Sequence, residues 1–336
     1  LLHGVIDSPD IPLNVSRSYL QSDANVKKIS NHITKKVSDK LEEIFKKERE
    51  DFEGKWDYIK IFIQYGMITD EKFYDRAAKY SLFKNIDGKY FTFEEYNNHV
   101  KETQTNTDKK VVYLYTTNKD EQFSFIESAK ERGYDVLEMD GHLDNHFVNH
   151  IESKLENVTF ARVDADTIDN LIKKEEKLPS KLNADEQSDL EKVFQSQLDN
   201  KFTVIFESLS ETDNPIIITQ PEFMRRMKDM QKLGGQSMMM GMPDYYNVVV
   251  NANHPMVYKL HEEKEEEIGG NVAVVKGELD ELNKKQSEFT KDEESRKAHE
   301  SELEQLKNDI SEKENKRDDI LKDFGKDHKI VKQLID

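Results

Sequence analysis

The chain has 336 residues, of which 35% are hydrophobic and 35% charged, with no cysteine and a net charge of −18. The absence of cysteine excludes disulfides, thiolate metal ligands and cysteine nucleophiles, and so acidic a chain repels phosphate backbones, so we expect no nucleic-acid partner. Since no apolar run reaches the length of a signal peptide or a membrane span, we expect a cytoplasmic protein with no membrane partner, and the length predicts two or three domains.

Residues 4–21 are predicted to form an irregular loop in front of a long helix. Pro9 and Pro12 fix their own φ angles and push the preceding residues toward extended geometry, so the helix cannot begin before about Ser18. Apolar residues then recur at steps of three and four, as on one face of a helix. They are Val26, Ile29, Ile33, Val37, Leu41 and Ile44. This helix is expected to end near Glu50.

Asn14, Arg17 and Gln21 are the candidate catalytic residues, because they lie on this loop. An arginine on a loop braced by a helix presents a planar, permanently charged group of donors to an anion. The simpler alternative is that Arg17 is an ordinary surface arginine.

A helical block and then a small α/β layer are predicted over residues 50–163. Apolar stripes predict helices up to about Val100, and Thr92 with Glu95 forms a capping box for the last of them. Strands are predicted at 111–117, 135–139 and 159–163, with helices between them at about 120–132 and 144–155. This alternation predicts parallel pairing, and the continuous apolar run of the first strand predicts burial on both faces.

A different domain is predicted beyond an exposed, charged linker at residues 173–187. The elements expected there are a helix at about 185–198, strands at 202–208, 215–220 and 246–252, and helices throughout 255–336. The predicted fold class is therefore a multidomain mixture of α+β and α/β structure. It comprises a helical block, a small α/β layer, and an α+β C-terminal domain that carries a long helical hairpin.

The hairpin is predicted from two apolar runs with alternating steps of four and three, separated by the polar segment TKDEESRKAHES. The first run contains Ile268, Val272, Val275, Leu279, Leu282, Gln286 and Phe289, and the second contains Leu303, Leu306, Ile310, Lys313, Arg317, Ile320 and Phe324. Antiparallel folding about residue 296 pairs Ile268 with Phe324, Val272 with Ile320, Leu282 with Ile310, and Phe289 with Leu303. Gly269, Gly270 and Gly325 lie at its base and predict a hinge. A disordered acidic insert is the alternative.

Two groups of side chains could bind metal ions, but neither is expected to do so. His142, His146 and His150 recur at every fourth residue, as ligands on one helix face would, but the chain lacks H-E-x-x-H and His142 precedes the predicted helix. Asp164 and Asp166 follow a strand, where carboxylates can bind metal or act as acid and base. A turn at the strand end is the favoured interpretation for them.

A methionine-rich segment predicts an exposed binding surface. Its apolar residues lie along one helical flank of PEFMRRMKDMQKLGG and are Phe223, Met227, Met230 and Leu233. Thioether side chains are flexible and polarizable, so a methionine surface can adapt to many partners. The alternative is that this stripe is ordinary core.

Residues 4–21, GVIDSPDIPLNVSRSYLQ, resemble the catalytic loop of the bacterial members of the ninety-kilodalton heat-shock chaperone family. The resemblance extends through about residue 180, weakens in the C-terminal third and fails at about 261–328. It implies an ATP-dependent molecular chaperone of the stress response and of protein folding, which binds unfolded or partly folded client proteins. It also implies a full-length homodimer, with ATP and Mg²⁺ as the cofactors of the parent protein.

The resemblance assigns roles to individual residues. Arg17 would reach in trans to the terminal phosphate of ATP held by a separate N-terminal ATPase domain, and Gln21 would complete the site. Asn14 is a candidate through its place on the same loop. The client-binding positions that the resemblance implies are Phe223, Met227 and Met230, and we expect Leu233, on the same flank, to bind clients with them. Because the chain contains neither G-x-x-x-x-G-K-[ST] nor G-x-G-x-x-G and begins with Leu1, we expect a fragment that lacks the nucleotide pocket and is inactive alone.

The expected domains are a catalytic loop at 1–22, a helical subdomain at 23–105, a small α/β subdomain at 106–178, a truncated client-binding and dimerisation domain at 179–260 and 326–336, and an inserted hairpin at 261–325. The alternative function is a free-standing α/β nucleotide-binding enzyme built on the sheet at 111–163. Such a sheet needs a glycine-rich turn after its first strand. TTNKDEQ follows this strand instead, so the chaperone is favoured.

Overall fold

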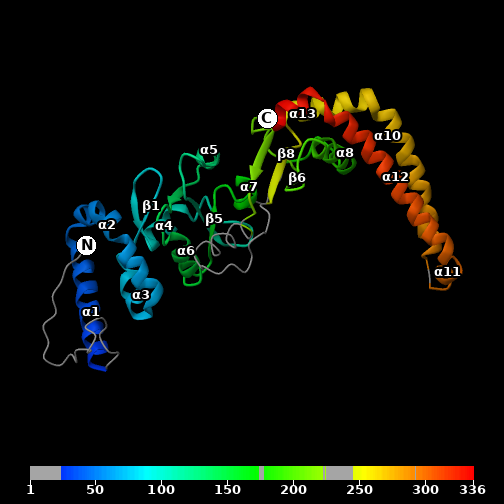
Figure 1. The fold of residues 1–336 in the computed structure, drawn as a ribbon. Helices are drawn as coiled ribbons and strands as arrows, with labels where there is room; N and C mark the ends of the chain where they lie inside the picture. The colour runs from blue at the N-terminus through cyan, green and yellow to red at the C-terminus, as the bar shows by residue number, and fades with distance from the viewer. Residues whose placement is uncertain (1–23, 174–177, 222–223, 225–244, 292) are drawn as a thin grey trace, which may run out of the picture. The chain divides into compact units, whose positions relative to one another are not determined.

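The computed structural model describes residues 24–173, 178–221, 224, 245–291 and 293–336. The chain divides into two compact units, Leu1–Val163 and Asp164–Asp336. Figure 1 shows the helices and strands of each unit. The mixture of helices with small sheets confirms the predicted fold class.

The first unit contains a helical block followed by an α/β layer. Its described helices are α1 (Ala24–Lys47), α2 (Arg49–Thr69), α3 (Glu71–Ala77), α4 (Phe93–Val100), α5 (Phe123–Glu131) and α6 (Asp144–Glu152). Its described strands are β1 (Leu82–Lys84), β2 (Tyr90–Thr92), β3 (Val111–Thr116), β4 (Val136–Glu138) and β5 (Val158–Arg162).

The α/β layer has the predicted parallel sheet. Strand β3 lies between β4 and β5, with Leu114 opposite Val136 and Val111 opposite Val158. Every residue of β3 after Val111 is buried, as predicted for a strand covered on both faces. The core beside it is aromatic, and the rings of Phe83, Tyr96, Tyr113 and Phe160 make edge-to-face contacts.

An antiparallel hairpin of β1 and β2 was not predicted. Leu82 pairs with Thr92, and Gly88 adopts a φ of 79° in the turn. Each strand has three residues, which is too short to display the period-two alternation that identifies strands in a sequence. The hairpin is followed by α4, where the predicted capping box of Thr92 and Glu95 is confirmed.

Among the side chains of α1 whose burial is described, those of the apolar stripe that pack against the core lie near the C-terminal end of the helix. Leu41 and Ile44 pack against buried side chains, whereas Ile33 and Val37 are 37% and 45% exposed. The Ser38 hydroxyl is hydrogen-bonded to the buried Tyr80 hydroxyl at 3.0 Å. Burial raises the pKa of Tyr80 to about 12, so this hydrogen bond stays neutral and joins α1 to the core.

The second unit is built around a mixed sheet. Its described elements are α7 (Ile168–Leu171), α8 (Ala184–Gln195), β6 (Phe202–Glu207), β7 (Ile216–Thr219), β8 (Tyr246–Asn251), α10 (Pro255–Phe289), α11 (Glu293–Ala298), α12 (Glu300–Lys326) and α13 (Lys329–Ile335). Strand β8 is central, parallel to β6 and antiparallel to β7. Apolar residues from β6, β8, α8, α10, α12 and α13 form one core.

The predicted hairpin is formed by α10 and α12, which run side by side (Figure 1). Val272 and Ile320 share one apolar cluster, and Leu282 and Ile310 share the next one along the arm. Lys313, a predicted polar member of the seam, forms an ion pair with Glu278 of α10. The ring of Phe289 stacks on His299 at 4.2 Å between centroids. We call this pair of helices the arm.

The base of the arm is held by α8. The buried carboxylate of Asp189 accepts hydrogen bonds from Lys264 at 3.1 Å and from Lys276 at 2.9 Å. Because these lysines lie twelve residues apart on α10, a single aspartate ties a long part of that helix to α8. Removing Asp189 would leave the buried Lys264 with Glu265 as its remaining ion-pair partner, which is costly for a buried charge.

The glycines at the base lie in a continuous helix or in close packing, and the predicted hinge stays a prediction. Helix α10 continues without a break through Gly269 and Gly270. Gly325 is buried against α8, where its carbonyl oxygen accepts a hydrogen bond of 2.6 Å from Gln197. The glycine is needed there because a side chain would collide with α8, so close packing explains this residue better than flexibility.

Candidate functional site

The predicted catalytic and client-binding residues lie outside the described part of the chain. This applies to Asn14, Arg17, Gln21, Phe223, Met227, Met230 and Leu233. The described structure shows what flanks them. Helix α1 begins at Ala24, shortly after the loop. The methionine-rich segment connects β7 with β8, two adjacent antiparallel strands of one sheet.

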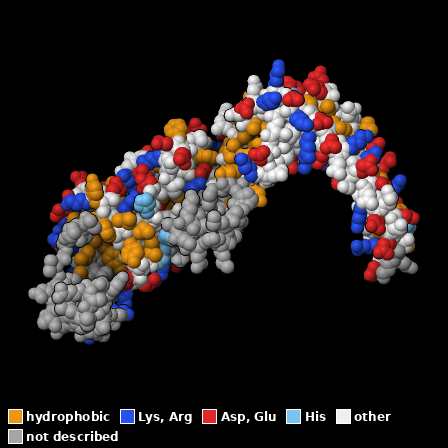
Figure 2. Space-filling model, in the orientation of Figure 1, with side chains coloured by type: hydrophobic (Ala, Val, Ile, Leu, Met, Phe, Trp, Pro, Cys, Tyr) orange, Lys and Arg blue, Asp and Glu red, His pale blue; other side chains and the backbone are white. Residues whose placement is uncertain are grey.

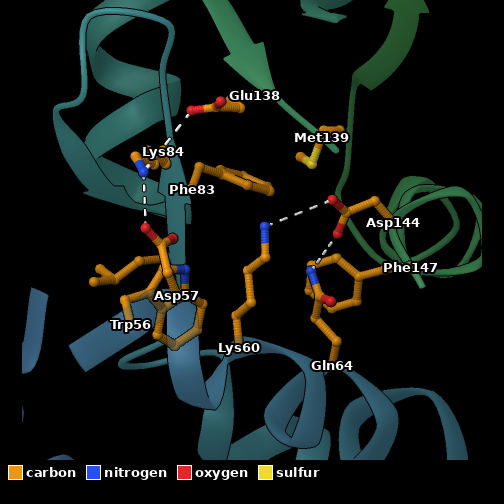
Figure 3. Close-up of a pocket in the computed structure, with 11 residues that line it drawn as sticks. Trp56, Asp57, Lys60, Gln64, Phe83, Lys84, Glu138, Met139, Asp144 and Phe147 are labelled. Carbon is orange, nitrogen blue, oxygen red and sulfur yellow. Dashed lines mark hydrogen bonds and ion pairs between the residues drawn. The ribbon is translucent and has the colours of Figure 1, made fainter. Parts of the chain in front are cut away.

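A small charged cavity lies among the described residues of the first unit. Its walls come from α2, β1, the end of β4, and α6, as Figure 3 shows. It is lined by Trp56, Asp57, Lys60, Gln64, Leu82, Phe83, Lys84, Glu138, Met139, Asp144 and Phe147. The cavity volume is about 10 Å³, which is about the room needed for one water molecule.

Asp144 is the buried anion of this cavity. It accepts hydrogen bonds of 2.7 Å from the Gln64 amide and from the Gly141 N–H, and Lys60 Nζ lies 4.0 Å away. Burial raises the pKa of Asp144, although Lys60 and these hydrogen bonds oppose the shift. Burial disfavours the charge on Lys60, but Asp144 and Asp140 outweigh it and raise the pKa of that lysine.

The second lysine of the cavity is also paired. Lys84 Nζ lies 2.8 Å from Asp57 and 3.9 Å from Glu138 (Figure 3). Both lysines of the cavity therefore have carboxylate partners within the protein, and there is no space for a nucleotide. We interpret this cluster as a set of stabilising contacts that joins α2 to β1 and to α6. Sequence reasoning missed it, because its charges come from segments far apart in the chain.

The C-terminal end of β3 does not have the geometry of a phosphate-binding turn. The side-chain oxygen of Gln122 accepts hydrogen bonds from the Thr116 hydroxyl at 2.6 Å and from the N–H groups of Thr117 and Asn118 at 3.0 and 3.3 Å. These are the N–H groups that a phosphate would need at this edge of the sheet. Since a side chain of the protein already occupies them, the alternative of a nucleotide-binding enzyme is not favoured.

The other candidate metal ligands lie at the surface or in local contacts within the protein. His142 and His146 are exposed, while the ring of His150 packs edge-on against Tyr74 at 5.5 Å. Asp166 accepts a hydrogen bond from the Thr167 N–H at 2.7 Å in the turn that leads into α7. Within the described residues, no group of three or more His, Asp or Glu side chains is placed to hold a metal ion. None of the described helices is long and apolar enough to span a membrane.

Comparison with known proteins extends the resemblance of the loop to the whole chain. The model of the Hsp90 protein family matches residues 1–320. A chaperone protein HtpG of Bacteroides fragilis (strain 638R) is 48% identical over 347 residues, which cover 100% of this chain and 51% of that protein. HtpG of Porphyromonas gingivalis (strain W83) has the same identity and coverage. HtpG of Roseobacter denitrificans is 29% identical over 228 residues, 66% of this chain and 36% of that protein.

These matches correct one expectation about the extent of the similarity, and they show how much of the relatives' length the chain covers. Similarity was expected to fail at about 261–328, but the relatives from Bacteroides and Porphyromonas cover that segment too. The chain spans about half the length of these relatives. Because the family model matches most of the sequence, the chain belongs to the Hsp90 protein family.

Proposed function

We propose that this chain is part of an ATP-dependent molecular chaperone and supplies Arg17 to a nucleotide site that a separate N-terminal domain forms. The observation that carries the proposal is the loop sequence NVSRSYLQ, with Asn14, Arg17 and Gln21, in a chain of the Hsp90 family. Phosphoryl transfer depends on positioned positive charge around the terminal phosphate. An arginine on a loop braced by α1 can supply that charge when the two domains meet.

We also propose that the methionine-rich segment binds unfolded or partly folded client proteins. Phe223, Met227, Met230 and Leu233 would form an adaptable apolar surface. Their segment joins β7 and β8, two hydrogen-bonded strands, so both its ends are fixed to one sheet. The full-length protein would act as a cytoplasmic homodimer.

In this proposal ATP and Mg²⁺ are bound by the parent protein, and this chain alone hydrolyses no ATP. The test is to titrate the isolated chain with ATP and Mg²⁺, and then to add the N-terminal domain as a separate polypeptide. We expect no hydrolysis before the addition, and hydrolysis above that of the N-terminal domain alone after it. Hydrolysis by the isolated chain, or no stimulation in the mixture, would count against the proposal.

A further inference from the structure

Ser38 is the buried side chain of α1 that lies nearest to the Arg17 loop. Among the residues of α1 whose burial is described, 27–47, Ser38 alone is buried, at 1% exposed. The apolar side chains of α1 that pack against the core, Leu41, Ile44 and Phe45, all lie on its C-terminal side. Figure 2 shows hydrophobic side chains, in orange, gathered in the region where Figure 1 places α2 and α3. The part of α1 before Ser38 therefore extends beyond the last buried contact of the helix.

The partner of Ser38 is itself fixed in the core. Tyr80, in the turn that follows α3, is 0% exposed, and its hydroxyl is hydrogen-bonded to that of Ser38 at 3.0 Å. The Tyr80 ring lies edge-on against Phe52 of α2, with 6.2 Å between centroids. The neighbouring ion pair of Asp39 with Arg76 has a separation of 3.7 Å and half-exposed side chains, so it contributes little.

A buried hydrogen bond constrains a helix in a way that apolar packing does not. Apolar attraction is non-directional, so Leu41, Ile44 and Phe45 hold α1 on the core without fixing its angle. A hydrogen bond between two hydroxyls requires a short distance and a defined direction. The Ser38–Tyr80 contact therefore fixes the angle at which α1 leaves the core.

This angle matters because the free part of α1 is long. At 1.5 Å per residue, the helix from Ala24 to Ser38 is about 21 Å long. A rotation of about 10° at Ser38 would displace Ala24 by about 4 Å over that length. Arg17 lies shortly before Ala24 in the sequence. Since a misplacement of about 1 Å at a reacting group can slow a reaction about 100-fold, a small change in this angle is enough to affect hydrolysis.

We propose that Ser38 and Tyr80 are positioning residues for Arg17, because their hydrogen bond sets the angle of α1 and so the place from which the Arg17 loop reaches the nucleotide. The proposal rests on the proposed function of Arg17 and adds two residues that act through it. It concerns the rate of hydrolysis and not ATP affinity, since the nucleotide would be held by another domain.

The angle of α1 can be measured in the chain itself, without ATP. Because the chain has no cysteine, nitroxide labels can be attached to Lys28→Cys in α1 and Glu102→Cys after α4, both of which are exposed. Double electron–electron resonance then gives the distribution of distances between the labels. Ser38→Ala should shift or broaden it. The matched control Ser30→Ala removes an exposed hydroxyl from the same helix and should leave it unchanged.

The rate is measured in the full-length parent protein. We expect Ser38→Ala and Tyr80→Phe each to lower ATP turnover about 10-fold with unchanged ATP affinity, and Ser30→Ala to have no effect. The double variant Ser38→Ala, Tyr80→Phe leaves no buried hydroxyl unpaired, so its stability should return toward that of the wild type. Its turnover should stay low, which separates positioning from a loss of stability.

The same assay with Arg17→Ala shows whether Ser38 acts through the arginine. Ser38→Ala should slow hydrolysis no further in that background, whereas independent, distant residues have additive effects. An equal slowing in both backgrounds would overturn the proposal, as would an unchanged label distance in Ser38→Ala or a double variant that recovers turnover with stability. If Arg17→Ala slows hydrolysis but Ser38→Ala does not, the positioning role alone fails. If Arg17→Ala leaves the rate unchanged, the proposed function fails, and the positioning role with it.

Discussion

Gly325 of α12 packs against the backbone carbonyl of Val193 in α8, so closely that a Cβ atom on the glycine would collide with that oxygen. The same added Cβ atom would lie 2.5 Å from the hydroxyl oxygen of Ser196. A backbone oxygen inside a helix cannot move aside. The closeness of α8 and α12 therefore depends on the absence of a side chain at position 325.

We predict that Gly325→Ala lowers the free energy of unfolding by about 1–3 kcal/mol, the usual cost of overpacking. The matched control is Gly270→Ala, because Gly270 lies inside α10 and an added Cβ would meet no atom within 4 Å. This control should be neutral or raise stability by up to about 1 kcal/mol. Urea unfolding measures both. A stable Gly325→Ala protein would show that α8 and α12 are not held in close contact.

The arm predicts a specific disulfide. Because the chain has no cysteine, Val272→Cys, Ile320→Cys introduces the only thiols, in positions that share an apolar cluster. Mild oxidation should crosslink them within one chain. The control Val274→Cys, Ile320→Cys should not crosslink, since Val274 is 64% exposed. Crosslinks only between chains in a denaturing gel would contradict the antiparallel hairpin.

Glu207 should make the protein less stable as the pH rises. Burial raises its pKa, and hydrogen bonds from Thr167 and Asn170 only partly oppose this. The native state therefore holds its proton to a higher pH than the unfolded state. Stability is lost between the ordinary glutamate pKa and the raised native value, and the loss is constant above it. Relative to the wild type, Glu207→Gln should become more stable across this range in urea unfolding.

Glu95 should have the opposite dependence. The Arg49 side chain lowers its pKa, so its contribution is complete above the ordinary glutamate pKa and is lost as the pH falls through the lowered native value. Glu95→Gln keeps the capping geometry but should be less stable than the wild type near neutral pH and equal to it in acid. If the stability of both glutamine variants relative to the wild type changed with pH in the same direction, the pKa values of Glu207 and Glu95 would not be shifted in opposite directions by folding.

The periodic elements could be predicted from sequence because their signals are local. The run from Val111 to Thr116 consists of apolar and β-branched residues, and the arm repeats its apolar residues over many turns. In contrast, the β1–β2 hairpin contains two strands of three residues, which are too short to show a period. The cavity around Asp144 was also unpredictable, because Gln64 lies 80 residues away from it in the chain. Pairings of this kind are products of the tertiary fold.

The proposed functional residues had a different kind of signal. Arg17 is a candidate because it lies in a loop sequence that resembles a known family. The comparison of the whole chain supports membership of that family. The glycines show the reverse case. Gly325 suggested flexibility by its residue type, but its neighbour Val193 makes it a packing residue. A residue type alone does not distinguish these two uses of glycine.

Replacing Met227 and Met230 together by Ser should weaken the binding of an unfolded polypeptide and leave the melting temperature nearly unchanged. Exposed apolar side chains contribute little to folding, whereas an adaptable methionine surface contributes directly to contact. Differential scanning fluorimetry and a binding assay on the same samples separate the two effects. A drop of many degrees would place the two methionines in the core.

The most direct measurement of the central proposal is single-turnover ATP hydrolysis by the full-length parent protein with Arg17→Ala. Loss of a charge that stabilises the transferring phosphoryl group should slow hydrolysis by about 10- to 1,000-fold, with little change in ATP affinity. Arg17→Lys should recover only part of the rate, because lysine lacks the planar group of donors. An equal loss of ATP binding and of turnover, or an unchanged rate, would contradict the assignment of Arg17 to the nucleotide site.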